Sequence, residues 1–423
     1  MTLETPAPRP IFRVPSPWRF FSLAACLLAL LALAGCGRGP SLNADASTGG
    51  TLQIMLGISS DEQLSEALVQ EQVELISWIE WCFEQLYPDV RLVLTQYREK
   101  DIPAELAQRD RDGMAPDLLL VNASTATALW RSGLTKPLPA NSPVAAQLRR
   151  SVRQRVSTDS QSLIGVPVLI TPQLACFNRK RLPASPASLP SLIDSSDKGI
   201  DVGMSIAPQD VYWTTGAMGA NPAMERVLWG EALGPADRQA LLRWLSWLQD
   251  VTLHERVNFY DNQEQLVQAL IRGQLDWITC SSTSLVRLRR VLGDRLGVAA
   301  LPGGPAGQAT PLLNHRMWIF GRNSSPVQQR IAEALVRFSL SPPMQRYLTI
   351  KTEAMLPVTG VSIPTGGRPM LEAMMQAKRQ ARATRAIGEQ IRVGDPRLES
   401  IRKLLLRLSY QEISSEQSRS PLY

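Results

Sequence analysis

The chain has 423 residues, of which 44% are hydrophobic and 20% are charged, and its net charge at pH 7 is +7. This length exceeds what one hydrophobic core usually supports, so we expect two domains. Acidic and basic residues are interspersed without a long Lys/Arg block, which argues against nucleic acid as a partner. Only two histidines occur, so zinc chemistry and histidine-based acid-base catalysis are poorly supplied.

The amino terminus has the charge and hydrophobicity of a secretion signal. A basic stretch of 19 residues precedes an apolar run from Phe20 to Gly35. That run has 16 residues, fewer than the roughly 20 that a membrane-spanning helix needs. The pattern therefore predicts a cleaved signal over residues 1–35 and not a permanent membrane span.

The residues Leu33, Ala34, Gly35 and Cys36 resemble the lipobox of bacterial lipoproteins. In such proteins the signal is removed before the cysteine, and the cysteine sulfur receives a diacylglyceryl group. The resemblance implies lipidation at Cys36 and anchoring to a membrane by acyl chains. An ordinary signal with an incidental cysteine is the alternative. Residues 36–50 are small and polar, as expected of a flexible tether.

Three further cysteines, Cys82, Cys176 and Cys280, would remain after lipidation. At most one disulfide could form among them. Each lies in an apolar run, and none has the short spacing of a metal or redox motif. We therefore expect buried free thiols in preference to a bridge.

Strands and helices alternate from residue 51 to residue 122. TLQIML and RLVLTQY are typical of strands, and PDLLLVN has the continuous apolar character of a strand buried on both faces. Residues 61–87 have helical spacing, and a short helix follows the second strand. This β-α-β-α-β order predicts a parallel sheet covered by helices, with ligands at the carboxyl ends of its strands.

A helix at 124–138 leads to a second series of elements. Two apolar strands, 163–170 and 174–178, are separated by only three residues including Pro172, which indicates a crossing between lobes. The later expected elements are strands at 200–206, 275–280 and 315–323, a glycine-rich strand and turn at 297–307, and helices at 235–250, 264–273 and 326–341. Residues 367–409 have a basic helical pattern, and residues 410–423 are expected to fray.

The order of these segments resembles the extracellular solute-binding proteins of ABC importers, in particular the sugar-binding family that includes the maltose-binding proteins. FEQLYPDVRLVL is similar to the opening helix and strand of that family, and PDLLLVNASTATALWRSGLTKPL to its third strand and following helix. LIGVPVLITPQLACFNRKRL is similar to its crossing strand. GQLDWITCSS, LGDRLGVAALPGGPAG and the stretch from MWIFGRN to EAMLPV resemble the return crossing and the closing helices. Together these stretches span about residues 50 to 360 in the family's order.

The resemblance implies an α/β fold of two lobes joined by a hinge, a type II periplasmic binding protein clamshell that closes on its solute. The expected division is 51–171 plus 297–325 for lobe 1 and 172–296 plus 326–409 for lobe 2. It also implies a lipid-anchored receptor in the periplasm or on the outer face of the cytoplasmic membrane. This receptor would deliver a carbohydrate, or a sugar-based compatible solute, to an ABC permease. We expect a monomer without a cofactor, a metal or enzymatic activity.

Sugars are bound by aromatic faces together with amide, hydroxyl and carboxylate groups. The resemblance places ligand contacts after the third strand, at Asn122 and Ser124, although Asn122 equally suits a helix cap. Thr171 and Gln173, at the first crossing, face the cleft if the strand register holds.

The loop QDVYWTT carries Asp210, Tyr212 and Trp213, which resemble the acidic and aromatic ligand residues of the family. Two aromatic residues and a carboxylate in a loop are less readily explained as core. Ser281 and Ser282 follow a strand and precede a helix, where hydroxyl groups either cap the helix or bind a ligand.

The segment LNHRMW, which contains Asn314, His315 and Arg316, aligns with a Gly-Gly-Trp segment of the family. Arg316 in a cleft would favour an anionic group through bidentate pairing, so an acidic sugar derivative is an alternative solute. A surface position for Arg316 is the other interpretation.

Three other classes stay open. A lipid-anchored enzyme is one, although no phosphate-binding glycine loop, nucleophile elbow or metal-ligand spacing occurs. A receptor for a metal or a polyamine is another, but the chain has no adjacent pair of tyrosines, and Asp210 is the one strong candidate for a cleft carboxylate. The third is a lipoprotein that has lost transport and serves a sensor or an assembly.

Overall fold

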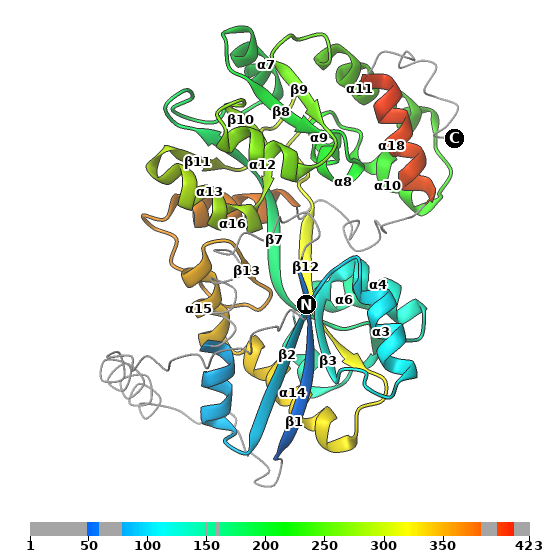
Figure 1. Cartoon of the computed structure of the whole chain (residues 1–423). Helices are drawn as coiled ribbons and strands as arrows, with labels where there is room; N and C mark the ends of the chain where they lie inside the picture. Colours follow the sequence, from blue (N-terminus) through cyan, green and yellow to red (C-terminus); the bar gives the residue numbers. More distant parts are fainter. Residues whose placement is uncertain (1–48, 59–77, 149, 158–160, 382–395, 410–423) are drawn as a thin grey trace, which may run out of the picture. The chain divides into compact units, whose positions relative to one another are not determined.

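The structure is a computed structural model that describes residues 49–58, 78–148, 150–157, 161–381 and 396–409 (Figure 1). The predicted signal peptide, Cys36, nearly all of the tether and the tail at 410–423 lie outside these residues. Within these ranges, none of the helices combines the length and apolar character needed to cross a bilayer.

The first group of strands confirms the predicted parallel sheet. β1 (Gly50–Ile58) pairs in parallel with β2 (Val90–Arg98) on one side and with β3 (Leu118–Asn122) on the other. β12 (Leu313–Gly321) then joins β3 in the antiparallel direction. Most residues of β1, β3 and β12 are buried, as expected for strands covered on both faces, whereas β2, at the edge of the sheet, is largely half-buried or exposed.

The central element is β7 (Val166–Asn178), a single strand of 13 residues. The sequence predicted two strands broken at Pro172, which is wrong, because β12 and β10 continue the pairing on either side of the proline. The first part of β7 pairs with β12 and with β13 (Leu356–Pro357). The second part pairs with β10 (Trp277–Ser281) and β11 (Leu296–Ala299). β7 therefore belongs to both groups of strands, as Figure 1 shows.

The second group of strands continues outward from β10. It adds β8 (Val202–Ser205), parallel to β10, and β9 (Val257–Tyr260), parallel to β8. The short strands β4 (Thr135–Lys136), β5 (Leu138–Pro139) and β6 (Ser162–Leu163) complete the set, with β5 and β6 forming a separate two-stranded sheet.

Helices alternate with the strands throughout the described chain, and residues 78–86 are also helical. The first half contains α3 (Ile102–Arg111), α4 (Ala123–Arg131), α5 (Pro143–Ala146) and α6 (Arg150–Val156). The second contains α7 (Leu189–Asp197), α8 (Pro208–Val211), α9 (Trp213–Ala217), α10 (Asn221–Trp229), α11 (Pro235–Val251), α12 (Gln263–Ile271) and α13 (Leu285–Leu292). The last helices are α14 (Pro326–Leu340), α15 (Pro342–Thr352), α16 (Pro369–Gln380) and α18 (Pro396–Ser409). Many of these helices begin at a proline. Proline has no N–H, but the first turn of a helix leaves that N–H unpaired, so no hydrogen bond is lost.

Two of the expected lobe assignments need correction. The predicted division placed α14 in lobe 2, but α14 packs against β1 and β12, the strands of the first group. It placed β11 in lobe 1, but β11 pairs with Ala175–Asn178, the end of β7 that also holds β10. Both assignments followed from expected hinge crossings near residues 297 and 323, which the packing of α14 and the pairing of β11 contradict. The other boundaries stay predictions.

The expectation of free thiols at Cys176 and Cys280 is wrong. The two sulfur atoms form a disulfide between β7 and β10, and both residues are fully buried. Their strands are antiparallel neighbours, so the two Cα atoms lie 5.9 Å apart, within the range that a disulfide requires. Cys82 takes no part in a disulfide and is of intermediate burial.

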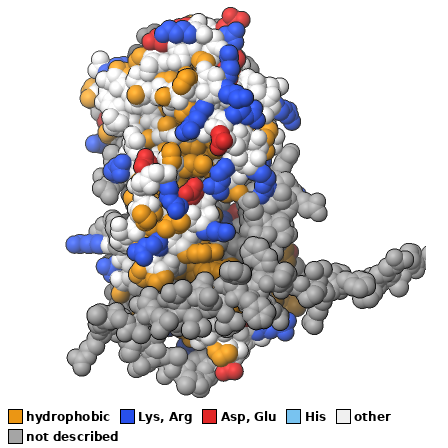
Figure 2. Space-filling view, turned by 90° about the vertical axis from the view of Figure 1, so that its left-hand side faces the viewer, with side chains coloured by type: hydrophobic (Ala, Val, Ile, Leu, Met, Phe, Trp, Pro, Cys, Tyr) orange, Lys and Arg blue, Asp and Glu red, His pale blue; other side chains and the backbone are white. Residues whose placement is uncertain are grey.

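On the face in Figure 2, Lys and Arg side chains are scattered among apolar and uncharged side chains and do not gather into one basic area. Several arginines are paired with acidic partners. Arg287 makes two hydrogen bonds of 2.8 Å to the Glu264 carboxylate, and Arg289 and Arg368 both contact Glu353.

Candidate functional site

The middle of β7 carries polar side chains where its pairing partners change. Thr171 and Gln173 are 4% and 6% exposed, with Pro172 between them. Thr171 is the register partner of Asn314 in β12, and Gln173 is that of Ser281 in β10. Because strand residues two positions apart point to the same face, Thr171 and Gln173 project from one side of β7. The predicted crossing residues therefore lie together and beside Ser281.

Gln173 connects β7 to α8, which carries Asp210. The Gln173 side-chain amide donates from Nε2 to the main-chain carbonyl oxygen of Asp210 at 2.7 Å. The Asp210 carboxylate accepts a hydrogen bond of 2.8 Å from the Ser205 hydroxyl at the end of β8. Oε1 of Gln173 is buried and accepts no hydrogen bond. Gln173 thus fixes the position of α8 and keeps a free acceptor.

Ser281 and Ser282 have different roles. The Ser281 hydroxyl oxygen accepts hydrogen bonds from the main-chain N–H and the hydroxyl of Thr283, at 3.4 and 3.0 Å, and so caps the short turn that follows β10. Ser282 is fully buried and donates to the carbonyl oxygen of Ala354 at 2.6 Å. Ser281 therefore stays in the candidate site, while Ser282 has a structural role.

A second polar group lies where β3 ends. Asn122 is the register partner of Arg316, and its side-chain oxygen accepts a hydrogen bond of 3.0 Å from the Arg316 guanidinium. Asn122 occupies the residue before α4, but its side chain does not cap that helix. Ser124 is half-buried in the first turn of α4. Arg316 also pairs with Leu169, two positions before Thr171, so this group adjoins the polar middle of β7.

Arg316 is neither on the surface nor available to an anion. Its guanidinium donates to the Glu99 carboxylate, to Asn122, and to the carbonyl oxygens of Gly57 and Leu120. Its side chain is 17% exposed, and that of Glu99 is 7% exposed. The prediction that Arg316 pairs with an acidic sugar in a cleft is therefore corrected. These four acceptors already surround its guanidinium.

Sequence reasoning missed Glu99. It directly follows β2, and its Oε1 accepts hydrogen bonds from the Asn122 main-chain N–H, at 2.9 Å, and from Arg316. The available signal was an acidic residue at the carboxyl end of a parallel strand, where ligands usually bind. The charged run REKD hid it, because such a run also suits an exposed loop.

The two aromatic candidates are core residues, which corrects the prediction. Trp213 is 1% exposed and packs against Trp277, with ring centroids 6.5 Å apart. Tyr212 is 3% exposed, and its hydroxyl donates to the Asn221 side-chain oxygen at 2.6 Å. Burial, with a smaller contribution from the Glu225 carboxylate, raises the pKa of Tyr212 above its ordinary value. Neither ring presents a face on which a sugar could stack in this structure.

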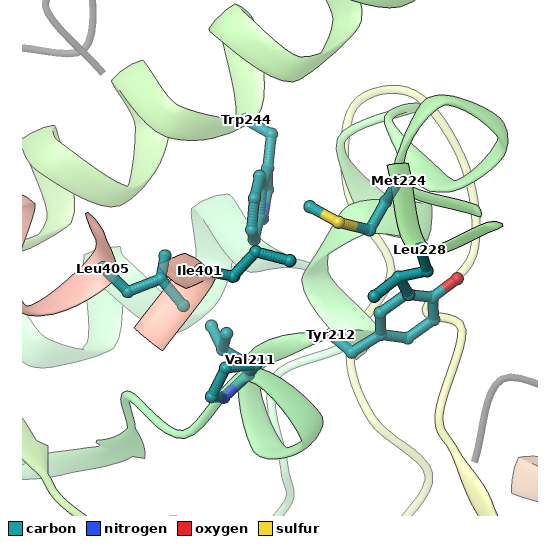
Figure 3. Close-up of a pocket in the computed structure, with 8 residues that line it drawn as sticks. Val211, Tyr212, Met224, Leu228, Trp244, Ile401 and Leu405 are labelled. Atoms are coloured by element: carbon teal, nitrogen blue, oxygen red, sulfur yellow. The ribbon is translucent and has the colours of Figure 1, made fainter. Parts of the chain in front are cut away.

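Tyr212 also lines an apolar pocket. The pocket lies among α8, α10, α11 and α18, and Figure 3 shows Ile401 and Leu405 of α18 directed toward Val211, Trp244 and their neighbours. No charged residue lines it. The pocket is therefore a packing contact of α18 and lacks the hydrogen-bonding groups that a sugar site requires.

The candidate site thus consists of two adjoining polar groups in and beside the described strands. The sequence-predicted members that the structure brings together are Asn122, Ser124, Thr171, Gln173, Asp210, Ser281 and Arg316, to which Glu99 is added. His315 is 3% exposed and points to the opposite side of β12 from its neighbours Asn314 and Arg316. Among the described residues, no cluster of three metal-ligating side chains occurs.

Known structures share this fold. The GacH receptor of Streptomyces glaucescens, solved unliganded and with acarbose, covers 88% of this chain and 96% of its own at 15% identity, with a TM-score of 0.66. A solute-binding protein of an ABC transporter from Thermotoga lettingae, bound to α-D-tagatose, has a TM-score of 0.65 at 13% identity and covers 88% and 98%. The maltose-maltodextrin binding protein of Alicyclobacillus acidocaldarius has a TM-score of 0.63 at 15% identity, with the same coverage. These similarities confirm the two-lobe periplasmic binding protein fold.

No curated protein sequence matches the chain. The model of the bacterial extracellular solute-binding protein family matches residues 82–372, more than half of the chain. The match begins at the helix before β2 and ends in α16, so it contains every described candidate residue. This chain therefore belongs to the bacterial extracellular solute-binding protein family.

Proposed function

We propose that this protein is the solute-binding subunit of an ABC importer and that it captures a carbohydrate, or a sugar-based compatible solute, between its two lobes. The observation that carries the proposal is the group of hydrogen-bonding side chains at the middle of β7, where Gln173 keeps a buried acceptor and lies near Thr171, Ser281 and Asp210. Amide, hydroxyl and carboxylate groups of this kind suit the hydroxyl groups of sugars. The structurally similar proteins that bind acarbose, tagatose or maltose support the same class of solute.

An importer subunit must release its solute unchanged. In the proposal, contacts to both lobes exist only in the closed form, so the solute shifts the population toward that form, and the permease recognises it. A lipid at Cys36 would keep the receptor near the transporter and raise its local concentration. Mass spectrometry of the protein from a bacterial membrane would test this part, because an unmodified Cys36 contradicts the anchor.

The central experiment is a thermal-shift screen of the protein without residues 1–35, followed by calorimetric titration. The panel contains maltose, maltotriose, acarbose, α-D-tagatose, glucuronic acid and spermidine. A ligand at 100 times its dissociation constant stabilises the folded state by about 2.7 kcal/mol, which a thermal shift detects readily. Stabilisation by neutral sugars, with the ligand recovered unchanged, is the expected result. The absence of any shift with a carbohydrate contradicts the proposed solute class.

Gln173 provides the test of the site itself. Gln173→Leu removes the free acceptor and the hydrogen bond to Asp210, so we expect at least a tenfold loss of affinity for the bound sugar. Gln345→Leu is the matched control, because Gln345 is a fully buried glutamine that is not a member of the candidate site and whose amide bonds the carbonyl oxygens of Val168 and Ser339. It should lower the free energy of unfolding without a selective loss of sugar affinity. Wild-type affinity in Gln173→Leu refutes this placement of the site.

A further inference from the structure

Glu99 is a buried carboxylate with one oxygen fully used and one oxygen unused. Its side chain is 7% exposed. Oε1 accepts from the Asn122 main-chain N–H and from the Arg316 guanidinium. Oε2 is also buried but accepts no hydrogen bond. An ionised carboxylate can accept about four hydrogen bonds, so half of the capacity of Glu99 is unmet. Buried acceptors without a donor are uncommon in proteins and often mark a functional site.

The position of Glu99 relates it to ligand binding. It directly follows β2, Gly57 is the last residue but one of β1, and Asn122 is the last residue of β3. Glu99 is therefore at the carboxyl edge of three parallel strands, where ligands of open α/β sheets usually bind. The main chain of β1 also comes close to it, since a Cβ atom at Gly57 would lie 2.4 Å from Oε1.

Its ion pair determines which charge a solute can carry. Arg316 and Glu99 neutralise one another, and Arg316 also donates to Asn122, Gly57 and Leu120. An anionic solute would meet the unused carboxylate oxygen, and a cationic solute would have to lose its hydration beside an ion pair that has no net charge. A neutral hydroxyl group avoids both costs and supplies the donor that Oε2 lacks.

We propose that Glu99 contacts the solute and determines its class: Oε2 accepts a hydrogen bond from a hydroxyl group of an uncharged, hydroxyl-rich molecule. This inference rests on the proposed function, because it assumes that the site takes a small solute. Because Oε2 is covered in this structure, the proposal includes a local rearrangement that uncovers it when the solute binds. The inference narrows the proposed function, since it excludes sugar acids and amino sugars as the preferred ligands.

The test is a thermodynamic cycle between protein and ligand. Maltotriose and its monodeoxy analogues are titrated into wild-type protein and into Glu99→Gln. In wild type, at least one monodeoxy analogue should bind ten times or more weakly than maltotriose, because it lacks the hydroxyl that bonds to Oε2. In Glu99→Gln, the affinity for maltotriose should fall by a similar factor, and the affinity for the same analogue should fall little further. The charged analogues glucuronic acid and glucosamine should bind wild type more weakly than glucose.

Two further variants separate ligand contact from structural support. Glu264→Gln is the control, because Glu264 also forms a partly buried pair, with Arg287, but belongs to α12. It should lower the melting temperature and leave the penalty for each deoxy analogue as in wild type. If Glu99→Gln does not fold, Glu99→Asp is used in its place. It keeps the charge beside Arg316 but moves the carboxylate oxygens back by one methylene. The affinity for maltotriose should again fall, and that for the deoxy analogue should fall little further.

The outcomes are distinguishable. Equal deoxy penalties in wild type and in the Glu99 variant overturn the role of Glu99 and leave the proposed function intact. Tighter binding of glucuronic acid or glucosamine than of glucose overturns the neutral solute class. If wild type binds no carbohydrate of the panel, the proposed function fails and this inference fails with it.

Discussion

Cys176 and Cys280 form a disulfide that joins β7 to β10 across 104 residues of sequence. The bond connects the strand shared by both groups to a strand of the second group alone, and both residues are fully buried. Disulfides persist in oxidising compartments, which agrees with membership of an extracellular protein family.

Removal of this bond should destabilise the protein strongly. In the chain-entropy model, closing a loop of about 100 residues stabilises the folded state by about 4.7 kcal/mol. We expect Cys176→Ala, Cys280→Ala and the reduced wild type to lose about 2–5 kcal/mol, measured by denaturant unfolding. Cys82→Ala, which removes a cysteine outside the disulfide, is the control, and the unfolding of this variant should still be sensitive to reductant. A wild type whose unfolding midpoint does not change on reduction would contradict this prediction.

Trp213 should matter for stability and not for solute contact. Trp213→Ala removes a ring that is 1% exposed and leaves a cavity, so the free energy of unfolding should fall by about 3–5 kcal/mol. Trp229→Ala is the control. Because Trp229 is 41% exposed, its replacement should lower the free energy of unfolding far less. Calorimetric titration of the folded fraction should give wild-type sugar affinity. A stable Trp213→Ala protein with a tenfold weaker affinity would restore Trp213 to the site.

The buried Tyr212 hydroxyl makes stability depend on pH in the alkaline range. Burial raises the pKa of Tyr212, so the folded state keeps the proton where the unfolded chain, with an ordinary pKa of about 10, releases it. The unfolded state then binds fewer protons, and the free energy of unfolding falls as pH rises above about 10. Tyr212→Phe should lose about 1 kcal/mol at pH 7, from the hydrogen bond to Asn221, and should show a shallower alkaline decline. Parallel alkaline profiles for the two proteins would refute the assignment.

Gly57 should tolerate no side chain. A Cβ atom there would lie 2.4 Å from Glu99 Oε1 and 3.0 Å from the Ile102 side chain, so Gly57→Ala must displace the buried Glu99 carboxylate. We expect a loss of about 1–3 kcal/mol together with weaker solute binding, since the carboxylate belongs to the candidate site. Gly366→Ala is the matched control, because a Cβ atom at Gly366 would have no neighbouring atom within 4 Å. Equal stability of the two variants would show that Glu99 has room to move.

Most of the fold was predictable because hydrophobic patterns are local. The parallel order of β1, β2 and β3 follows from apolar strands separated by helical spacing. The break predicted at Pro172 was wrong because proline within a strand costs only a donor, and the flanking residues keep their partners in β12 and β10. The disulfide could not be deduced, since it depends on the antiparallel pairing of strands far apart in sequence.

The candidate site was only partly predictable, for a similar reason. Thr171, Gln173 and Asp210, which stay predicted site residues, could be proposed because they lie where strands end or cross. Tyr212 and Trp213 were misassigned because the loop that carries them folds into two short helices packed against α11 and against Trp277. Glu99 and Arg316 are 217 positions apart, so no local pattern could reveal their pairing or the single oxygen that it leaves unused.

The unbroken course of β7 has a mechanical consequence. Because one strand belongs to both groups, a change in the angle between the groups has to bend its backbone, and at Pro172, which has no N–H to give to the ladder, the strand has one hydrogen-bond donor fewer to hold it in place. The side chains on either side of that proline are Thr171 and Gln173. A solute held by these two side chains would therefore bind where the strand bends, so its binding would directly change the curvature of β7.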